Sequence, residues 1–474
     1  MEKTKLVFFD DYWLDFRTGT VRRWFDPERI GEFCDPKLLG GSGANTFYDK
    51  EQDQYLVQYW ASDDVGQDEK RMPAMVSTKD FKTFQPVILK PDAPEGRKHI
   101  IRECDDGISM DCITLDRAEP DEAKRYKATA LYFPDGIKDF ANIKMVGCYS
   151  PDCINWTVDT DNYLHHTTSD ADNNIIWNPV TQEYMLFFRA GYVDRRICCK
   201  TSKDLKTWSD AVVTVHPGAW YNNEAYQVQL YGMVPTYSNG VFYAMMQIFY
   251  TSLTDMDFTK MWGYVETELY YSYDGYHYMP TSGKAIVPRP QAPAYGCTQM
   301  YLMHLCDTAD GHDYIISGSG ARVIHGTGES NKMLSDELKG EAFGSCFYKI
   351  RKDGFCGIEG MGIGAQVITK CIQLLDPEIS INVNASCGFI RYGLMKKYGE
   401  FYDGFSFDDC EVLKFGESVD YKLRWKNADP ATLVGEQVRL AVELNGAILF
   451  SATFEGRPCI RRPQTSFSNP NQLL

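Results

Sequence analysis

Short apolar runs separated by turn residues dominate the chain. Residues 172–177 ("DNNIIW"), 183–190 ("EYMLFFRA") and 195–202 ("RRICCKTS") have the length and composition of three consecutive strands, and 206–215 ("KTWSDAVVTV") adds a fourth. The turns between them carry Asn-Pro, Gly and Asp, which are typical of turns between β-strands. Helical periodicity is nearly absent, and 330–340 ("SNKMLSDELKG") is the best short helical segment. The pattern predicts an all-β protein.

One short segment recurs along the chain. It reads "STKDFKTF" at 77–84, "SPDCINW" at 150–156, "SKDLKTW" at 202–208 and "SYDGYHY" at 272–278, with a Ser, then an Asp, then an aromatic residue. The intervals of 73, 52 and 70 residues between the copies are too uneven for a solenoid. A β-propeller fixes only the four strands of each blade and lets its loops vary. We therefore expect the segment to be the hairpin between a blade's third and fourth strands.

Five such units can be placed along the chain. They begin at "GANTFYD", "GISMDCITL", "DNNIIW", "EAYQVQL" and "CTQMYLM". After Gly364 the sequence changes to short alternating strands with Gly, Asn and Asp turns, which is typical of a β-sandwich. The predicted fold is therefore a five-bladed β-propeller over residues 1–362, including an N-terminal lead-in strand, followed by a β-sandwich over residues 363–474.

Composition and charge narrow the choice of partners. The aromatic share of 14% favours strands and suits a surface that binds sugars. A net charge of -16 without clustered Lys and Arg argues against a nucleic-acid partner. No segment reaches the roughly 18 apolar residues of a membrane helix, so we expect no membrane partner. Whether copies of the chain form a homo-oligomer stays open.

The N-terminus and the cysteines indicate the cellular compartment of the protein. The apolar run at Leu6 to Phe9 is shorter than the roughly 7–15 residues of a secretory signal. The 15 cysteines include no CxxC pair and no Cys/His cluster at zinc spacing, which indicates buried reduced thiols. We therefore expect a cytoplasmic protein with no metal and no cofactor.

Several motifs in one order resemble a known family. These are "FFDDYW", "DEAKRYKA", "DNNIIWNP" with "EYMLFFRA", "EAYQVQ" and "IRKDGF". Over roughly residues 5–455 the chain resembles bacterial glycoside-hydrolase-like proteins with a five-bladed β-propeller and a C-terminal β-sandwich, related to families 43 and 32. The resemblance implies a glycosidase that acts on short oligosaccharides. The first blade reads "GGSGANTFYD" where family 32 enzymes carry an "NDPNG"-like nucleophile motif, so the resemblance supports the fold more than the chemistry.

Glycosidases flank the scissile bond with two carboxylates, and this superfamily often adds a third that tunes the acid. In a propeller the loops that enter the innermost strands meet at one mouth, so we searched the strand starts for acidic residues. Asp111, Asp172 and Glu224 stand there in three consecutive blades. We expect Glu224, which lies among aromatic residues, to be the general acid, because desolvation raises a carboxyl pKa. Asp111 is then the base or nucleophile, and Asp172 tunes and orients the acid.

Neutral and basic residues near the same strand starts are candidates for substrate contacts. The candidate substrate-binding residues are Asn45, Asp170, Asn173, Arg189, Tyr226, Gln227, Gln299 and Tyr301. An Arg at the end of a strand can hold a carboxylate or a phosphate with two parallel hydrogen bonds.

Two other functions fit the same sequence. A glycoside phosphorylase would use phosphate in place of water and would need basic side chains in the tunnel, and Arg189, Arg195 and Arg196 supply such a cluster. A non-catalytic carbohydrate-binding propeller would bind sugars without turnover, and the missing first-blade Asp favours it. In all three readings the partner is a carbohydrate.

Overall fold

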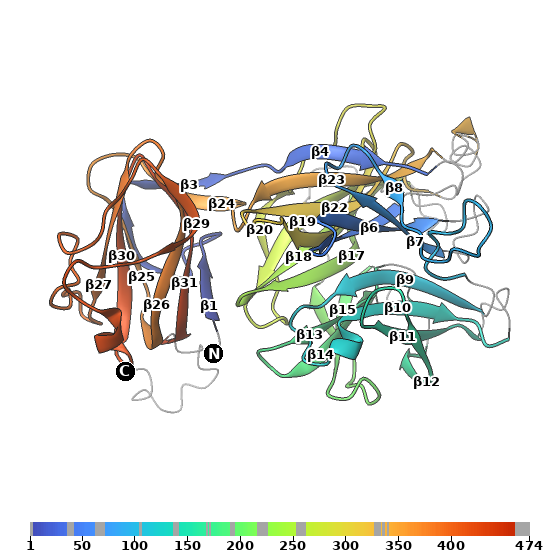
Figure 1. The fold of residues 1–474 in the computed structure, drawn as a ribbon, viewed down its shortest axis with the longest axis horizontal. Helices are drawn as coiled ribbons and strands as arrows, with labels where there is room; N and C mark the ends of the chain where they lie inside the picture. The colour runs from blue at the N-terminus through green and yellow to red at the C-terminus, as the bar shows by residue number, and fades with distance from the viewer. Residues whose placement is uncertain are drawn as a thin grey trace. The chain divides into compact units, whose positions relative to one another are not determined.

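The structure is a computed structural model of the chain. It describes residues 3–35, 42–61, 72–103, 107–135, 142–166, 169, 172–189, 195–215, 226–252, 262–326, 333, 337–338 and 341–459, without the side chains of 42–44, 111–112, 226–227 and 252. The described secondary structure is almost entirely strand, which confirms the predicted all-β class (Figure 1). No helix among the described residues is long and apolar enough to cross a membrane.

The chain divides into two compact units, Asp26–Lys352 and the pair of segments Met1–Phe25 and Asp353–Leu474. We call the first the blade unit and the second the terminal unit. The expected boundary at 362/363 differs from this division, because residues 1–25 and 353–362 belong with the C-terminal strands. The difference arises from strand pairing between segments that lie far apart in sequence.

The blade unit contains five groups of four antiparallel strands within the described residues. Blade one is β5 (Ser42–Asp49), β6 (Gln54–Ala61), β7 (Met72–Thr78) and β8 (Gln85–Pro86). Blade two is β9 (Ile108–Leu115), β10 (Tyr126–Tyr132), β11 (Lys144–Ser150) and β12 (Thr157–His165). Blade three is β13 (Asn174–Asn178), β14 (Glu183–Arg189), β15 (Ile197–Ser202) and β16 (Val212–Val215).

Blades four and five share one sheet. Blade four is β17 (Tyr226–Ser238), β18 (Val241–Ser252), β19 (Gly263–Ser272) and β20 (Met279–Ala285). Blade five is β21 (Gln299–Asp307), β22 (Asp313–Ala321), β23 (Phe343–Arg351) and β4 (Glu28–Phe33). A single parallel pair, Val265 with Gln299, joins the two halves. Blade five is completed by β4, a strand from near the N-terminus.

The recurring segment forms the hairpin between the third and fourth strands of blades one to four, as predicted. In the copy at 202–208, the Ser202 hydroxyl accepts a hydrogen bond from the Leu205 N–H at 2.9 Å. The Asp204 carboxylate accepts from the N–H groups of Lys206 and Thr207 at 2.8 and 2.7 Å. In the first copy the hydroxyl belongs to Thr78, so the repeat begins one residue later than the sequence pattern suggested.

Apolar cores between neighbouring blades hold the blade unit together. One core joins blade one to blade five, where the Phe81 and Phe347 rings lie 5.2 Å apart. Another core, which includes Met185 and Phe242, joins blades three and four.

Blade two also holds a buried ion pair, in which the Lys127 ammonium lies 3.2 Å from Asp116 and 3.0 Å from Glu119. Blade three is bonded to both carboxylates, because the Trp177 N–H donates to Asp116 and the Tyr184 hydroxyl donates to Glu119 at 3.2 Å. These contacts build the frame rather than a site.

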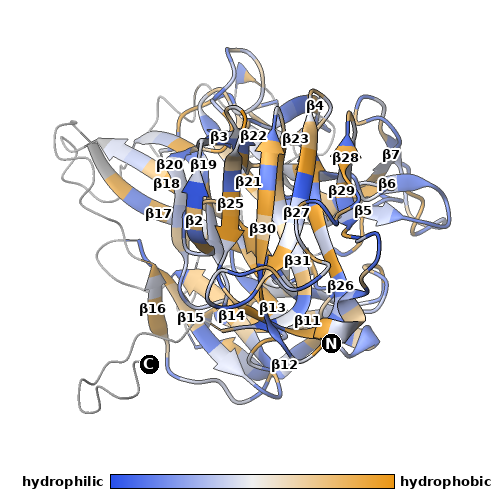
Figure 2. Cartoon of the chain, turned by 90° about the vertical axis from the view of Figure 1, so that its left-hand side faces the viewer, coloured by the Kyte–Doolittle hydropathy of each residue, from blue (hydrophilic) through white to orange (hydrophobic). Residues whose placement is uncertain are grey.

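The terminal unit pairs the first three strands of the chain with strands from its last third. β1 (Lys3–Val7) pairs with β31 (Ile448–Pro458), β2 (Leu14–Thr18) with β25 (Ala365–Thr369), and β3 (Thr20–Trp24) with β24 (Cys356–Gly360). The remaining strands are β26 (Ile372–Asn384), β27 (Phe389–Met395), β28 (Leu413–Lys414), β29 (Glu417–Lys422) and β30 (Gln437–Asn445). Figure 2 shows the hydrophobic positions along β25 and β30 that form its core.

The described helical turns are short. One, η3 (Glu122–Lys124), lies in blade two, and the other, η6 (Pro430–Leu433), lies in the terminal unit. The 330–340 segment, named above as the best helical candidate, lies largely outside the described residues.

Candidate functional site

The first strands of consecutive blades are tied to one another by side-chain hydrogen bonds. The Asn45 amide donates to the Ile113 carbonyl, and the Thr114 hydroxyl donates to the Asn174 side-chain oxygen at 3.3 Å. The Asn174 amide donates in turn to the Met233 carbonyl at 3.2 Å. These bonds hold β5, β9, β13 and β17 side by side.

Four of the five first strands lose their regular pairing at one point along their length. The register shifts at residues 43–44 in β5, 111–112 in β9, 231 in β17 and 303 in β21. An extra residue of this kind re-aims side chains and is common beside active sites. Asp111 therefore belongs to a segment whose backbone is already irregular.

Asp172 lies just before β13 and is buried, with 7% of its surface exposed. Its φ of +27° is in the left-handed region. The carboxylate lies against Gly232 of β17, where an added Cβ would be 2.4 Å from Asp172 Oδ2. The irregular pairing at residue 231 and the glycine at 232 therefore make room for a carboxylate between blades three and four.

Two tyrosines connect Asp172 to blades four and five. The rings of Tyr231 and Tyr301 lie 5.2 Å apart, and the Tyr301 hydroxyl donates to the Gln299 side-chain oxygen. The Gln299 amide donates to the Val323 carbonyl at 2.6 Å, which fixes its orientation. Burial, followed by the charges of Tyr231 and Asp172, raises the pKa of Tyr301 well above its usual value. Tyr301 is therefore a neutral donor within the electrostatic reach of Asp172.

Basic side chains also lie around Tyr231. Arg189 Cζ is 5.0 Å from the centre of the Tyr231 ring, and Arg195 Cζ is 5.8 Å from it. Arg195 Nη1 donates to the Gln229 side-chain oxygen at 2.7 Å. The His325 ring is centred 5.1 Å from the Tyr231 ring. We call Arg189, Arg195, Tyr231, Phe249 and His325 the basic cluster.

Burial and the repulsion between positive charges lower the pKa values of side chains in this cluster. Burial, with the neighbouring charge of Arg195, lowers the pKa of Arg189 to about 10. Burial and the charges of Arg195 and Arg189 lower the pKa of His325 to about 4. At neutral pH the cluster therefore carries two guanidinium charges and one neutral imidazole.

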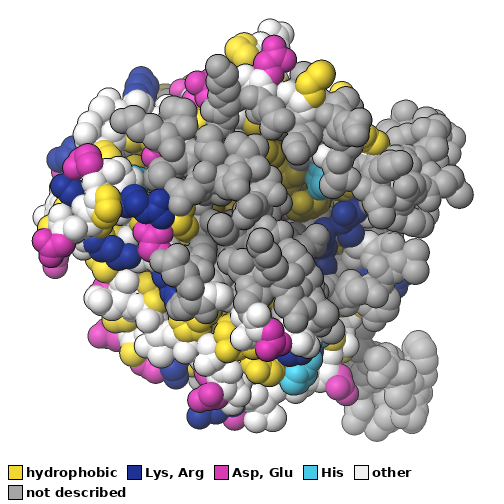
Figure 3. Space-filling model, turned by 90° about the vertical axis from the view of Figure 1, so that its right-hand side faces the viewer, with side chains coloured by type: hydrophobic (Ala, Val, Ile, Leu, Met, Phe, Trp, Pro, Cys, Tyr) yellow, Lys and Arg dark blue, Asp and Glu magenta, His cyan; other side chains and the backbone are white. Residues whose placement is uncertain are grey.

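The structure brings some of the predicted residues together. Arg189 and Tyr301 lie against the Tyr231 ring, Gln299 accepts from the Tyr301 hydroxyl, and Asp172 lies against the neighbouring Gly232. Asn173 is buried beside Asp172, and its amide donates to the Ser169 carbonyl at 2.9 Å. Figure 3 shows one face of the molecule, on which Lys, Arg and His side chains lie beside hydrophobic ones.

Other predicted residues lie elsewhere or outside the description. Asn45 is buried and bonded to blade two through Ile113. Glu224 and Asp170 lie outside the described residues, as do the side chains of Asp111, Tyr226 and Gln227. The convergence of Asp111, Asp172 and Glu224 at one mouth stays a prediction.

The sequence search missed Tyr231, Phe249 and His325. Tyr231 precedes a glycine within a strand, and such a glycine often marks an irregular pairing where a side chain is redirected. That signal was available in "QLYGMV". His325 follows β22 in a turn and contacts the cluster only because blades four and five pack together. No local sequence pattern predicts that packing.

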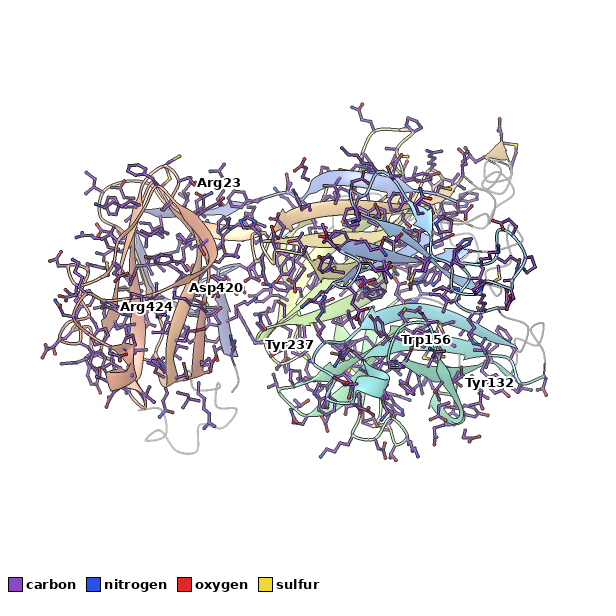
Figure 4. The ribbon with its side chains drawn as sticks, viewed as in Figure 1. Arg23, Tyr132, Trp156, Tyr237, Asp420 and Arg424 are labelled. Carbon is purple, nitrogen blue, oxygen red and sulfur yellow. The ribbon has the colours of Figure 1, made fainter. Side chains whose placement is uncertain are left out.

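A small pocket of about 70 Å³ opens at the opposite ends of the first strands. It is lined by residues such as Asn45, Thr114, Tyr237 and His304. Figure 4 labels Tyr237, near the end of β17, and Tyr132, at the end of β10 beside the start of β9, at opposite ends of the blade unit. The pocket has room for about two waters, which is too little for a sugar ring.

Metal ligands are not grouped in the described part of the chain. No set of three or more His, Cys, Asp or Glu side chains there is arranged to hold a metal ion. The chemistry that the described side chains offer is a buried carboxylate, neutral hydroxyl and amide donors, and two guanidinium groups.

Comparison with known proteins gives structural similarity alone. No family model matches the sequence. No curated protein matches it either. Among solved structures, an N-acetylgalactosamine deacetylase from F. plautii in complex with blood group B trisaccharide is 11% identical, with 71% of this chain and 97% of that chain covered and a TM-score of 0.43.

Two further solved structures are similar at the same level. A fructofuranosidase from Schwanniomyces occidentalis complexed with fructosylnystose is 10% identical, covers 90% of this chain and 97% of its own, and has a TM-score of 0.41. An α-L-arabinanase from Penicillium chrysogenum complexed with arabinobiose is 10% identical, covers 69% and 98%, and has a TM-score of 0.38. At identities this low, similarity of structure does not carry over the chemistry of a site.

Proposed function

We propose that the chain is a glycosidase of the bacterial five-bladed β-propeller type, related to families 43 and 32. The supporting observation is the buried Asp172 carboxylate beside Gly232, within the electrostatic reach of the Tyr301 hydroxyl. Carboxylates in a polar and aromatic setting are the groups that glycoside hydrolysis needs. Tyrosine and amide side chains around them provide faces and hydrogen bonds for a sugar ring.

In this proposal Asp172 orients and tunes the acid, Glu224 protonates the leaving oxygen, and Asp111 acts as base or nucleophile. The substrate is a short oligosaccharide or glycoside, and the blade unit carries the catalysis, while the C-terminal strands form a β-sandwich. The cysteines of the described residues are free thiols, which supports a reducing, cytoplasmic setting.

A panel of chromogenic glycosides and short plant oligosaccharides tests the activity. We expect wild-type protein to hydrolyse at least one of them. Asp172→Asn, which keeps the shape and removes the charge, should lower turnover by roughly 10²–10⁴-fold, the usual cost of losing a catalytic carboxylate or its partner.

Asp210→Asn is the matched control, because Asp210 is exposed in a hairpin of the same blade. It should leave turnover unchanged. Equal activity of Asp172→Asn and the wild type would contradict the role given to Asp172, and absence of turnover with every glycoside would leave the carbohydrate-binding alternative.

A further inference from the structure

The basic cluster contains cationic side chains that the hydrolysis of a neutral glycoside does not require. Hydrolysis of that kind needs carboxylates and water, and no buried cation has to approach the sugar. Here two arginines lie within 6 Å of the same Tyr231 ring centre, at 5.0 and 5.8 Å. Arg195 also lies 5.3 Å from the Phe249 ring centre. The two guanidinium groups are therefore gathered around one aromatic pair.

The imidazole ring of His325 lies against the same two aromatic rings, Tyr231 and Phe249. The His325 ring stacks on Phe249 with 4.7 Å between centroids and 25° between planes, and it meets Tyr231 edge to face. Since His325 is neutral at pH 7, it contributes one N–H donor and no further positive charge. The cluster thus combines two forked cationic donors with one neutral donor.

Such a set favours an oxyanion. The positive charge of Arg195 disfavours that of Arg189, and an anion within reach of both guanidinium groups is attracted by both, more strongly where water is excluded. Guanidinium groups bind phosphate, sulfate and carboxylate through paired hydrogen bonds. The Gln229 side-chain oxygen, which accepts from Arg195 Nη1 at 2.7 Å, fixes the direction of that guanidinium.

The cluster also lies beside the proposed reaction centre. The Asp172 carboxylate lies against Gly232, and the Arg189 guanidinium lies 5.0 Å from the ring of the preceding residue, Tyr231, so both groups meet the same part of β17. An anion held by the arginines would therefore be next to the sugar that Asp172 serves.

We propose that Arg189, Arg195 and His325 form a subsite for an oxyanion of the reaction, supplied either as inorganic phosphate or as an acidic group on the sugar. The inference rests on the proposed glycosidase function for its reaction. If phosphate is the ligand, one of its oxygens bonds to the anomeric carbon while the glycosidic carbon–oxygen bond breaks. The leaving oxygen takes a proton from the general acid, which is restored from hydrogen phosphate, and the products are a sugar 1-phosphate and an alcohol.

If the ligand is an acidic group of the sugar, the subsite forms no covalent bond and only positions the substrate. A carboxylate or sulfate on the ring would then select charged over neutral glycosides. The two sources share the same contact chemistry and differ in their products.

Calorimetric titration of the full chain with inorganic phosphate, sulfate and D-glucuronate tests the subsite directly. We expect at least one of them to bind, and Arg189→Gln and Arg195→Gln each to weaken binding by roughly 10–100-fold, the cost of a lost hydrogen bond to a charged group. Arg322→Gln is the matched control, since Arg322 also lies over a tyrosine ring, at 4.0 Å from the Tyr295 centre, in blade five. It should bind as the wild type does.

Product analysis then separates the two sources. Phosphate-dependent release of a sugar 1-phosphate assigns the subsite to phosphate, and turnover confined to uronides or sulfated sugars assigns it to the substrate. His325→Gln, which keeps a neutral donor, serves as a second variant if an arginine variant fails to fold, and it should weaken binding less than either arginine change.

Failure of this inference differs from failure of the proposed function. If none of the three anions binds while neutral glycosides are hydrolysed, the subsite is refuted and the glycosidase stands. If an anion binds, its binding requires both arginines, and no glycoside is turned over, the subsite is supported and the proposed glycosidase function is refuted. Binding that is equal in wild type and both arginine variants would also overturn the subsite.

Discussion

Asp172 occupies a backbone conformation that few L-residues adopt, and Gly232 makes the place for its carboxylate. Left-handed conformations of non-glycine residues cost roughly 1–3 kcal/mol and persist where the surroundings over-determine them. The Asn174 amide, which donates to the Asp172 carbonyl at 2.8 Å, is one such constraint. The strain and the glycine together hold one carboxylate in a defined place between two blades.

The Gly232 position gives a prediction. In Gly232→Ala the added Cβ would lie 2.8 Å from the Cβ of Asp172, so that side chain has to move. We expect the free energy of unfolding to fall by about 1–3 kcal/mol, as in overpacked interiors, and any glycoside turnover to fall at least roughly tenfold. Denaturant unfolding and the glycoside assay measure the two effects.

Gly362→Ala is the control for this change. Gly362 has nothing within 4 Å of an added Cβ, so stability and turnover should stay at the wild-type level. A Gly232→Ala protein with unchanged stability would mean that the contact with Asp172 is not tight.

The sequence predicted individual site residues only where they lie at the start of a blade's first strand, because the order of the strands is then enough to place them. Asp172, Gln299 and Tyr301 stand at or just before the start of a first strand, so counting blades was enough to find them. Tyr231 was missed because the irregular pairing at that residue breaks the alternation of sides on which such counting depends.

At the scale of elements, the four Ser/Thr–Asp hairpins share one backbone device. The residue three positions after the hydroxyl has a positive φ in every copy: 58° at Phe81, 64° at Cys153, 63° at Leu205 and 78° at Gly275. The Asp carboxylate bonds the next two free N–H groups, which a turn would otherwise expose. Each hairpin is thus closed by its own side chains.

This device predicts the effect of removing one carboxylate. Asp204→Ala loses the acceptor for two backbone N–H groups at the tip of blade three. We expect a melting temperature a few degrees below that of the wild type, with anion binding at the basic cluster unchanged. Asp210→Ala, in the same hairpin, should melt as the wild type does, and equal melting of the two variants would show that the turn bonds do not contribute.

The hairpins were predictable because every interaction in them lies within a few residues. The pairing of β4 with β23, which completes blade five, could not be predicted in this way. β4 pairs with β23 across more than 300 residues, for instance Phe33 with Ser345, and no local pattern in 28–33 names that partner. The same limit hid the pairing of β1–β3 with the terminal unit, so the expected boundary at 362/363 came ten residues late.

For the molecule as a whole, one buried and two half-buried histidines link stability to pH. Burial lowers the pKa of His304 to about 3, and burial followed by the charge of Lys200 lowers that of His165 to about 4. Together with His325, these side chains bind protons less readily when folded than the roughly 6.5 of an unfolded histidine. Their contribution to stability is complete above pH 6.5 and is lost as the pH falls toward 4.

A prediction follows for His304, which is buried in β21. In the wild type the free energy of unfolding should decrease steadily between pH 6.5 and 4. His304→Gln should reduce that slope by up to about 1.4 kcal/mol per pH unit, the value for one proton. Denaturant titrations across this range provide the measurement.

The control is His277→Gln, because the His277 side chain is exposed at 86%. It should leave the slope as it is. A slope that stays the same in His304→Gln would contradict the prediction, because it would mean that His304 binds its proton equally well in the folded and the unfolded protein.

The pairing of β1 with β31 also has a consequence for the order of events during synthesis. Val7 is aligned with Ser451, so a growing chain has to add more than 400 residues before this partner exists. At roughly 5–20 residues per second this takes about 20–90 s. The blade unit, whose sequence lies wholly within that interval, can fold on the ribosome while the first three strands wait. Those strands are edges without partners in the meantime, and they are the part of the nascent chain for which we expect chaperones to compete.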